Sequence, residues 1–227
     1  MSKYRDFLKK VSLFKKLEEK ALNVLGDTLS QKMYPKNSVI FEQGDPGEAM
    51  YLILYGRVKV VLYSESGREV ILSYLKDDDF FGEMAIVAKQ SRSATVITLE
   101  DTSLLRLSRE DFAAQVHKCP DIALGLLEVL AARLKEADEK IGDLALIDVY
   151  GRVARYLLRL GQEQGKPMEG GVLVEARPTH QEIANVVGTA RETVSRAISE
   201  FIKSGKIRIE GKTLFIPKGT SLSKEYL

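Results

Sequence analysis

Six short β-rich runs between residues 34 and 107 constrain the fold more than any other feature of this sequence. Turn-forming segments such as DPGE, SESGRE and KDDD separate the runs, which read SVIF, MYLILYG, VKVVLY, EVILSYL, ATVITLE and SLLRLS. Short strands that alternate with such turns are typical of antiparallel sheets that close on themselves or stack in two layers. We therefore expect a closed or double-layered antiparallel sheet, preceded by short amphipathic helices in residues 4–32.

A long helix is predicted to follow, from about residue 120 to 147. Apolar residues recur in it at intervals of 3, 4, 3, 4 and 3, namely Leu127, Leu130, Leu134, Ala137, Ile141 and Leu144. This spacing is the heptad seam of a two-stranded coiled coil. The seam could pack on the chain's own β-domain or on a second copy. Because Leu126, Val129 and Leu146 give the helix further apolar flanks, both can hold, and we expect a homodimer.

Residues 177–205 carry the pattern of a helix-turn-helix. Thr179 with Glu182, and Thr189 with Glu192, each have the Thr-x-x-Glu spacing of a capping box, which predicts two helix starts. Between them, Ala184 is small enough for close helix approach, Gly188 suits the tight turn and Val194 fills the angle between the helices. After a second predicted helix at 149–165 and a Gly/Pro-containing link at 165–171, this small helical unit ends in a hairpin pattern, KIRIEGKTLFIP.

The second helix of this motif is predicted to bury Val194, Ala197, Ile198, Phe201 and Ile202. Its other face presents polar residues, which are Arg191, Glu192, Ser195, Arg196 and Ser199. Arginine matches guanine in the major groove, glutamate can accept from cytosine, and serine can contact a base or a phosphate. The alternative is a solvated helix face with local ion pairs, and Glu192 could serve the cap, a cytosine or both.

Charge and composition restrict the remaining functions. Residues 149–227 hold 13 Lys and Arg against 8 Asp and Glu, which favours a polyanionic partner for this part of the chain. No stretch approaches the length of a membrane span or a signal peptide, so we expect a cytoplasmic protein without a membrane partner. The two histidines, His117 and His180, lie outside the β runs, and Cys119 is the single cysteine. This argues against a metal site, a haem or redox sensor, and an enzyme.

The stretch GEMAIVAKQSRSATV, residues 82–96, places three polar residues in an otherwise apolar run. Glu83, Arg92 and Ser93 could form a structural ion pair with a nearby hydroxyl, or they could bind a ligand. From the residues alone both interpretations stay open.

Three motifs, in this order, resemble the cyclic-AMP receptor protein and FNR superfamily of bacterial transcription regulators. They are FFGEMAI…SRSATV, EKIGDLALIDVYGRVARYLL and HQEIANVVGTARETVSR, and the likeness covers nearly the whole chain and is closest to the cyclic-AMP receptor branch. The resemblance implies an α+β fold. It would consist of a cyclic-nucleotide-binding β-roll (a double-stranded β-helix) in residues 1–119, a coiled-coil dimerisation helix in 120–147 and a winged helix-turn-helix domain in 148–227.

The resemblance also implies a ligand site in residues 82–96, the phosphate-binding cassette of the family. There a short helix N-terminus, Arg92 and Ser93 would hold the cyclic phosphate, and Glu83 would accept from the ribose 2′-hydroxyl. The full set of expected ligand-binding residues is Gly82, Glu83, Met84, Arg92, Ser93, Ala94, Arg133, Ala137 and Asp138. No cofactor other than a cyclic nucleotide effector is expected.

One departure from the family affects the effector. The cyclic-AMP receptor protein has a Thr-Ser pair on the dimerisation helix where this chain has Ala137 and Asp138. Cyclic AMP remains the expected effector, but a carboxylate near the base leaves cyclic GMP possible. The alternatives are cyclic di-GMP or another effector, or a constitutive regulator with a vestigial pocket. Asp138 could equally be solvated, or paired with Lys135 or Lys140.

For DNA, the resemblance of RETVSR implies a palindromic double-stranded site with TGA cores, flanked as TGTGA or TTGA, and RNA polymerase as a further partner. The expected DNA-binding residues are Thr179, His180, Arg191, Glu192, Ser195, Arg196, Ser199 and Lys203. Among them, His180 and Lys203 are phosphate contacts or merely solvated side chains.

Overall fold

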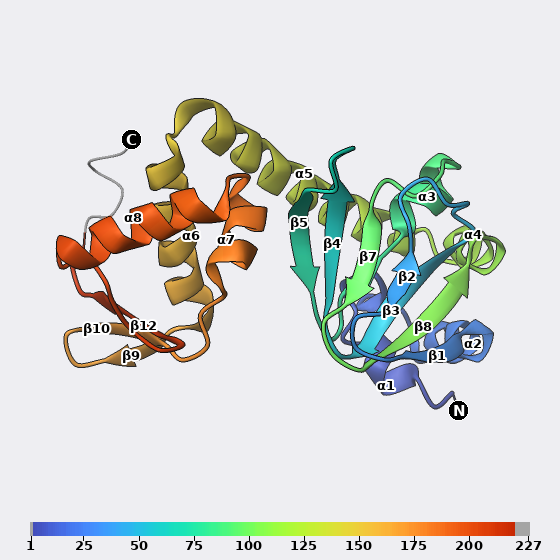
Figure 1. Ribbon diagram of the computed structural model, residues 1–227. Helices are drawn as coiled ribbons and strands as arrows, with labels where there is room; N and C mark the ends of the chain where they lie inside the picture. Colours follow the sequence, from blue (N-terminus) through green and yellow to red (C-terminus); the bar gives the residue numbers. More distant parts are fainter. Residues whose placement is uncertain (1, 221–227) are drawn as a thin grey trace. The chain divides into compact units, whose positions relative to one another are not determined.

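The computed structural model describes residues 2–220. The chain forms two compact units that divide after Leu134, within a long helix (Figure 1).

The first unit begins with short helices that cover one end of its β-structure. They are α1 (Arg5–Leu8), the 3₁₀ turn η1 (Ser12–Phe14) and α2 (Glu19–Thr28). The apolar residues that mark these helices in the sequence, among them Phe14, Leu22 and Leu25, are buried in one core with Met50, Leu52 and Leu105 from the strands. The helices are amphipathic, so they bury this face and expose their lysines.

Two four-stranded antiparallel sheets form the body of the first unit, which confirms the expected double-layered β-structure. One sheet has the order β1 (Ser30–Tyr34), β8 (Thr102–Ser108), β3 (Ala49–Tyr55) and β6 (Phe80–Phe81). The other has the order β2 (Val39–Phe41), β7 (Thr95–Thr98), β4 (Val58–Tyr63) and β5 (Glu69–Leu75). Ile53, Val58, Phe81, Val96 and Leu104 from both sheets form the core cluster that holds them together. The short helix α3 (Glu83–Ala88) follows β6 directly and leads through residues 89–94 to β7.

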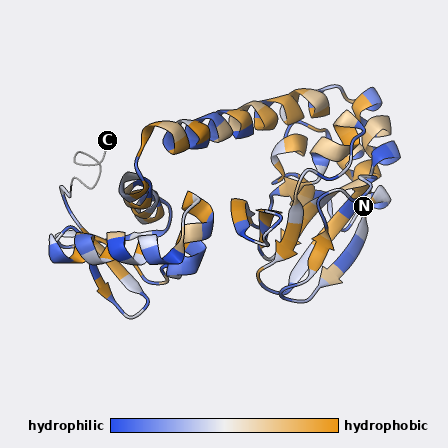
Figure 2. Cartoon of the chain, turned by 45° about the horizontal axis from the view of Figure 1, so that its top comes forward, coloured by the Kyte–Doolittle hydropathy of each residue, from blue (hydrophilic) through white to orange (hydrophobic). Residues whose placement is uncertain are grey.

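Helix α4 (Arg109–Lys118) and the long helix α5 (Asp121–Leu146) follow β8, the last strand of the first unit. The first turns of α5 bury Ile122 and Leu126 in the core of the first unit. The predicted heptad seam is largely exposed, with exposed fractions of 61% at Leu127 and 63% at both Leu134 and Ile141. In Figure 2, apolar and polar residues both run along this helix. Of the further apolar residues on the flanks, Leu126 is buried, whereas Leu146 has 84% of its surface exposed.

The second unit is a small helical domain with a four-stranded antiparallel sheet. Its helices are α6 (Val149–Gln164), α7 (His180–Val187) and α8 (Arg191–Lys203), and its strands are β9 (Lys166–Met168), β10 (Gly171–Val174), β11 (Arg208–Glu210) and β12 (Thr213–Pro217). The sheet has the order β11, β12, β10, β9. The predicted hairpin, β11–β12, therefore pairs through β12 with a second hairpin, β9–β10. The sequence had suggested only a link at residues 165–171. A Cβ at Gly171 would lie 2.2 Å from the carbonyl oxygen of Ile216, so close strand approach explains the glycine.

The helix-turn-helix is present, with Gly188 in the left-handed region (φ 72°) between α7 and α8 and with Ala184 and Val194 fully buried. Thr179 and Glu182 form the complete capping box of α7. The second predicted box was wrong, because α8 begins one residue later, with Ala190 as its N-cap and no side-chain cap. Ile202 was also predicted to be buried but is 44% exposed.

The two threonines therefore differ in their expected effect on stability. Thr179→Ala should lower the free energy of unfolding by about 1 kcal/mol, because it leaves backbone donors of α7 unsatisfied. Thr189→Ala removes no cap and should change it by less than about 0.5 kcal/mol. Urea denaturation of both variants against wild type measures the difference, and equal losses would contradict the assigned helix starts.

Candidate functional site

The candidate ligand site of the first unit begins at a glycine whose backbone is left-handed. Gly82 is the N-cap of α3 with φ of 82°. A Cβ there would lie 2.6 Å from Nη1 of Arg92, so the position needs glycine for both conformation and space. The same turn places Glu83 in the first turn of α3 and brings the Arg92 guanidinium against its start.

Arg92 is a nearly fully buried cation, with 5% of its surface exposed. Its Nη1 donates to the carbonyl oxygen of Gly82 at 2.9 Å and its Nη2 to that of Ala49 at 2.7 Å. The guanidinium lies over the ring of Phe41 at 4.1 Å and near that of Tyr51 at 5.9 Å. Burial lowers the pKa of Arg92, while Tyr51, Asp45 and Glu83 oppose the shift. Its Nε is buried and has no hydrogen-bond partner within residues 2–220.

Glu83 is equally buried, with 3% of its surface exposed, but its partner is Arg133. Nη1 of Arg133 donates to Oε1 of Glu83 at 2.8 Å, and Nη2 donates to the carbonyl oxygen of Phe80 at 2.7 Å. Arg133 also lies over the Phe80 ring at 4.8 Å. The sequence had left open an ion pair between Glu83 and Arg92; the carboxylate pairs instead with the first part of α5.

The other expected ligand residues divide into two groups. Ser93 is exposed, with its hydroxyl 3.8 Å from the Met84 sulfur, and Ala94 is buried beside it. These lie in the first unit with Glu83, Arg92 and Arg133. Ala137 and Asp138 are exposed residues of α5 that belong to the second unit. Lys140, one of the two lysines considered as a partner for Asp138, pairs with Glu136 at 2.9 Å.

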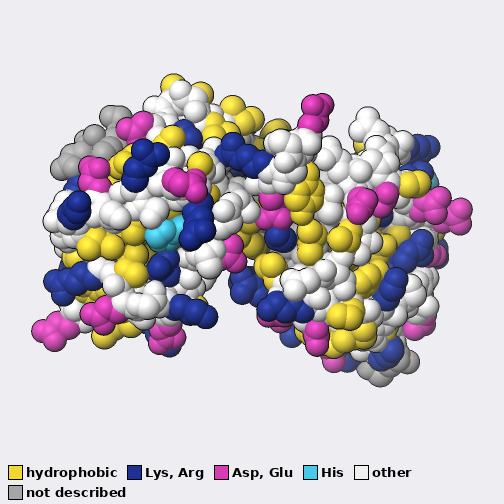
Figure 3. Space-filling model, in the orientation of Figure 1, with side chains coloured by type: hydrophobic (Ala, Val, Ile, Leu, Met, Phe, Trp, Pro, Cys, Tyr) yellow, Lys and Arg dark blue, Asp and Glu magenta, His cyan; other side chains and the backbone are white. Residues whose placement is uncertain are grey.

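In the second unit, α8 presents the expected polar face. Arg191, Glu192, Arg196, Ser199 and Lys203 are exposed, whereas Ser195 is half-buried and accepts on its main chain from the Ser199 hydroxyl at 2.8 Å. Basic side chains are prominent on the face of this unit that Figure 3 shows. A cation at the first residue of a helix opposes the helix dipole, so Arg191 gains no stability from its position.

The remaining DNA candidates lie at the start of α7. The Thr179 hydroxyl is engaged in the capping box with Glu182. Burial lowers the pKa of His180, and the neighbouring charges of Arg177 and Arg191 lower it further. His180 thus lies in a locally positive environment, which suits a contact with a phosphate.

Sequence reasoning missed the surroundings of the cassette. Phe41 and Tyr51 come from strands and stack near Arg92, and nothing in their spacing signals that contact. Arg109, the first residue of α4, was also missed. Its Nη2 donates to the carbonyl oxygens of Gly47 at 2.6 Å and Ala85 at 3.1 Å. The one available signal was a cation at a helix start, where the dipole disfavours it.

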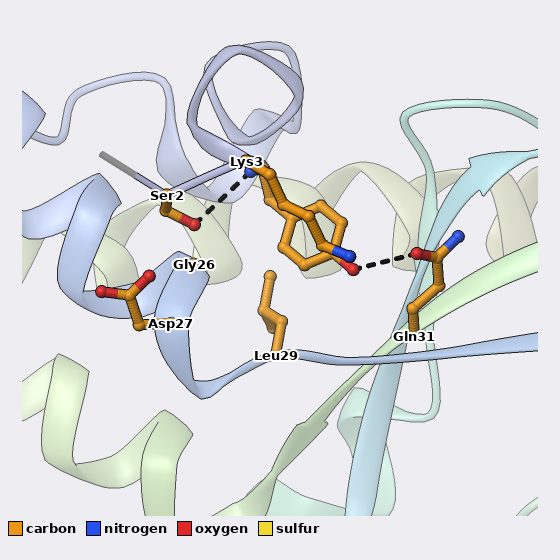
Figure 4. A pocket seen from close by; sticks show the side chains of 7 residues that line it. Ser2, Lys3, Gly26, Asp27, Leu29 and Gln31 are labelled. Carbon is orange, nitrogen blue, oxygen red and sulfur yellow. Dashed lines mark hydrogen bonds between the residues drawn. The ribbon is translucent and has the colours of Figure 1, made fainter.

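A separate pocket of about 490 Å³ lies among the N-terminal segments of the first unit (Figure 4). Ser2, Lys3, Asp27 and Gln31 are among its lining residues, and the Tyr4 hydroxyl donates to Oε1 of Gln31 at 3.0 Å. None of its residues belongs to the cassette. Over residues 2–220, no helix is long and apolar enough for a bilayer, and no three or more His, Cys, Asp or Glu side chains are grouped to hold a metal.

Comparison with known proteins defines the class of the two units. Residues 31–119 match the model of the cyclic nucleotide-binding domain, and residues 151–224 match that of the Crp-like helix-turn-helix domain. The chain is therefore a cyclic-nucleotide-binding module joined to a DNA-binding module.

Relatives over nearly the whole chain identify the family. A CRP-like cAMP-activated global transcriptional regulator of Mycobacterium tuberculosis is 33% identical over 96% of this chain and 98% of its own length. The cyclic AMP receptor protein of Thermus thermophilus is 35% identical over 93% of this chain and 95% of its own length. The chain belongs to the cyclic-AMP receptor protein and FNR family of transcription regulators. Because these homologues are regulators, the family excludes the enzyme alternative.

Solved structures agree with the fold. The Thermus thermophilus catabolite activator protein matches with a TM-score of 0.56 and 34% identity, over 94% of this chain and 97% of that one. The c-di-GMP responsive global regulator CLP of Xanthomonas campestris matches with a TM-score of 0.77 over 88% of this chain and 99% of that one, but at 24% identity it supports the fold alone. The expected β-roll and C-terminal helix-turn-helix are thus confirmed.

Proposed function

We propose that this protein is a homodimeric transcription regulator in which cyclic AMP, bound by the cassette, controls binding of the helix-turn-helix pair to palindromic DNA. The observation that carries the proposal is a buried acid and a buried base in one cassette that do not pair with each other: Glu83 bonds to Arg133 and Arg92 bonds to backbone carbonyls. A cyclic nucleotide offers each a matching group. Its phosphate suits the cation, and its ribose hydroxyl suits the carboxylate.

Binding would exchange partners that both side chains already have. Arg92 holds its guanidinium with two neutral carbonyl acceptors, which a phosphate anion would replace with stronger charge-assisted bonds. Its Nε, buried without a partner among the described residues, would gain one. Glu83 would accept a hydrogen bond from the ribose hydroxyl, and its bond with Arg133 would then either persist or break. Because Arg133 belongs to α5, this contact connects α5 to the ligand.

The effector is the finer part of the proposal. Relatives at 33% and 35% identity are named for cyclic AMP, which supports cyclic AMP here. The carboxylate of Asp138 supports some recognition of cyclic GMP, because one carboxylate can accept two hydrogen bonds from N1–H and N2–H₂ of guanine. We therefore propose a cyclic AMP sensor with weaker discrimination against cyclic GMP than a Thr-Ser pair would give.

The dimer and the DNA contacts complete the proposal. The exposed seam of α5 is apolar over several turns, and a second copy of the same helix is the partner that a heptad spacing fits. The exposed Arg191, Arg196 and Lys203 of α8 are the proposed contacts to bases and phosphates of a site with TGA cores. RNA polymerase is proposed as the partner of the DNA-bound dimer.

Arg92→Ala tests the ligand site. It should weaken binding of cyclic AMP by about 10- to 100-fold, because a charge-assisted contact contributes about 1.5–3 kcal/mol. Calorimetric titration measures this, with Arg57→Ala, an exposed arginine of the same unit, as the control that removes the same charge. Unchanged binding in Arg92→Ala would refute the cassette assignment.

Replacing Leu134 and Ile141 by Asp tests the dimer. Burying unpaired charges in the seam should give monomers, because desolvation of a carboxylate exceeds the gain from the remaining contacts. Sedimentation equilibrium distinguishes the states, with Ala132→Asp as a control on the same helix outside the seam. A double variant that stays dimeric would show that the interface lies elsewhere.

Arg196→Ala tests DNA recognition. We expect a loss of about 1–3 kcal/mol in discrimination at one guanine of the half-site, whereas Lys203→Ala should weaken all sequences alike or change nothing. Binding to DNA selected from a random pool measures both effects. Selection that yields no palindrome with TGA cores would contradict the proposal.

Asp138→Ser tests the purine argument. Removal of the carboxylate leaves the guanine donors without an acceptor, so the affinity ratio should move toward cyclic AMP by about 1–3 kcal/mol. The adjacent Glu139→Ser removes the same charge from α5 and should leave the ratio unchanged. If Asp138→Ser and wild type have the same ratio, Asp138 does not contact the base.

A further inference from the structure

Arg109 joins two segments that flank the cassette but come from different parts of the chain. Its Nη2 donates to the carbonyl oxygen of Gly47, in the loop of residues 42–48, and to that of Ala85, in α3. Its main-chain N–H donates to the carbonyl oxygen of Glu48 at 2.9 Å. One side chain thus fastens the helix that carries Glu83 to the loop between β2 and β3.

The same loop is bonded to the backbone of Arg92. The N–H of Arg92 donates to the carbonyl oxygen of Asp45 at 2.9 Å, and the N–H of Gly44 donates to that of Arg92 at 2.9 Å. The loop is therefore bonded to the backbone of Arg92 and, through Arg109, to the helix that carries Glu83. Arg109 fixes its contact with α3, and the backbone bonds fix its contact with Arg92.

Loop 42–48 and α3 approach each other so closely at Gly47 that no space is left for a side chain there. Gly47 is buried, and a Cβ at this position would lie 2.1 Å from the Cβ of Ala85 and 3.1 Å from the carbonyl oxygen of Gln90. Such an approach brings carbonyl groups of both segments within reach of one guanidinium. Both carbonyls accept from one nitrogen, Nη2, whose two N–H groups can serve two acceptors at once.

Arg109 is not explained by the stability of its own helix. As the first residue of α4 it opposes the helix dipole, and its Nε is buried without a hydrogen-bond partner within residues 2–220. Both features disfavour arginine here unless its bonds to loop and helix serve another purpose.

We infer that Arg109 is a positioning residue of the nucleotide site, which sets the separation of Glu83 and Arg92 by fastening α3 to loop 42–48. The inference rests on the proposed binding of a cyclic nucleotide. In such a ligand the phosphate is fused to the ribose, so the distance between the phosphate and the 2′-hydroxyl is nearly fixed. A site that holds both must keep its acid and its base at a matching distance.

The first test compares affinities for cyclic AMP in full-length variants that circular dichroism shows to be folded at the assay temperature. Arg109→Ala should bind about 10-fold more weakly, because α3 is no longer held, and Arg109→Lys should recover part of the loss through one donor group. Arg57→Ala is the control for charge. A role in stability alone would lower the urea midpoint of Arg109→Ala but leave its affinity equal to that of wild type, which would overturn the inference.

A second test does not depend on Arg109→Ala folding. Gly47→Ala should push α3 from the loop and weaken binding by a similar factor, and adding Ala85→Gly should restore most of it because the closest clash, at 2.1 Å, is with the Cβ of Ala85. If Gly47→Ala binds like wild type, the spacing does not matter and the inference is wrong. If wild type itself binds no cyclic nucleotide, the proposed function fails first and the inference with it.

A double-mutant cycle separates positioning from an independent effect. In an Arg92→Ala background, Arg109→Ala should change affinity by less than about 3-fold, since a spacing between Glu83 and Arg92 no longer contributes to binding. The same factor in both backgrounds would show that Arg109 acts without Arg92 and would overturn the inference.

Discussion

The burial of Arg92 is the constraint on which the first unit depends. An arginine with only 5% of its surface exposed must have acceptors and neighbours arranged around it, because an unpaired charge in a protein interior is strongly destabilising. The carbonyl groups of Gly82 and Ala49 and the ring of Phe41 meet that need. Gly82 is glycine because Arg92 lies against it and because its left-handed backbone, with φ of 82°, favours glycine. The fold thus stabilises a cation in its interior, where the proposed phosphate of the ligand would pair with it.

Glu83 shows how such a site can communicate with the rest of the chain. Its carboxylate bonds to Arg133 of α5, three residues after Leu130 of the predicted seam. A ligand that competes for Glu83 changes a contact of α5, and α5 leads to the DNA-binding unit. Differential contacts of this kind are what an allosteric response requires. The same helix therefore serves three proposed roles, in ligand sensing, dimerisation and connection.

Much of this organisation could be predicted from local patterns. Alternating apolar residues and turn chemistry revealed the strands, the heptad spacing revealed α5, and Thr179 with Glu182 revealed the start of α7. Thr189 misled because the same four-residue pattern occurs one residue before the actual N-cap, Ala190, and helix starts depend on tertiary packing as well as on sequence. The hairpin β9–β10 was missed because its few residues, rich in Gly and Pro, resemble a linker.

The site was harder to predict than the fold. Glu83, Arg92 and Ser93 stand out as polar residues in an apolar run, but their partners come from distant segments. Arg133 lies fifty residues from Glu83, and Phe41 lies about as far from Arg92. Pairing over such separations follows from topology rather than from any local pattern, so a Glu83–Arg92 ion pair was a reasonable hypothesis from sequence and was wrong in the fold.

The central claim is that ligand binding in the cassette controls binding of DNA by the helix-turn-helix. The most direct measurement is the affinity of the wild-type protein for a palindromic DNA with TGA cores, at one salt concentration, with and without saturating cyclic AMP. The account predicts that the nucleotide strengthens DNA binding by about 5- to 150-fold, and that DNA strengthens nucleotide binding by the same factor. Equal DNA affinities with and without a nucleotide that demonstrably binds would contradict it.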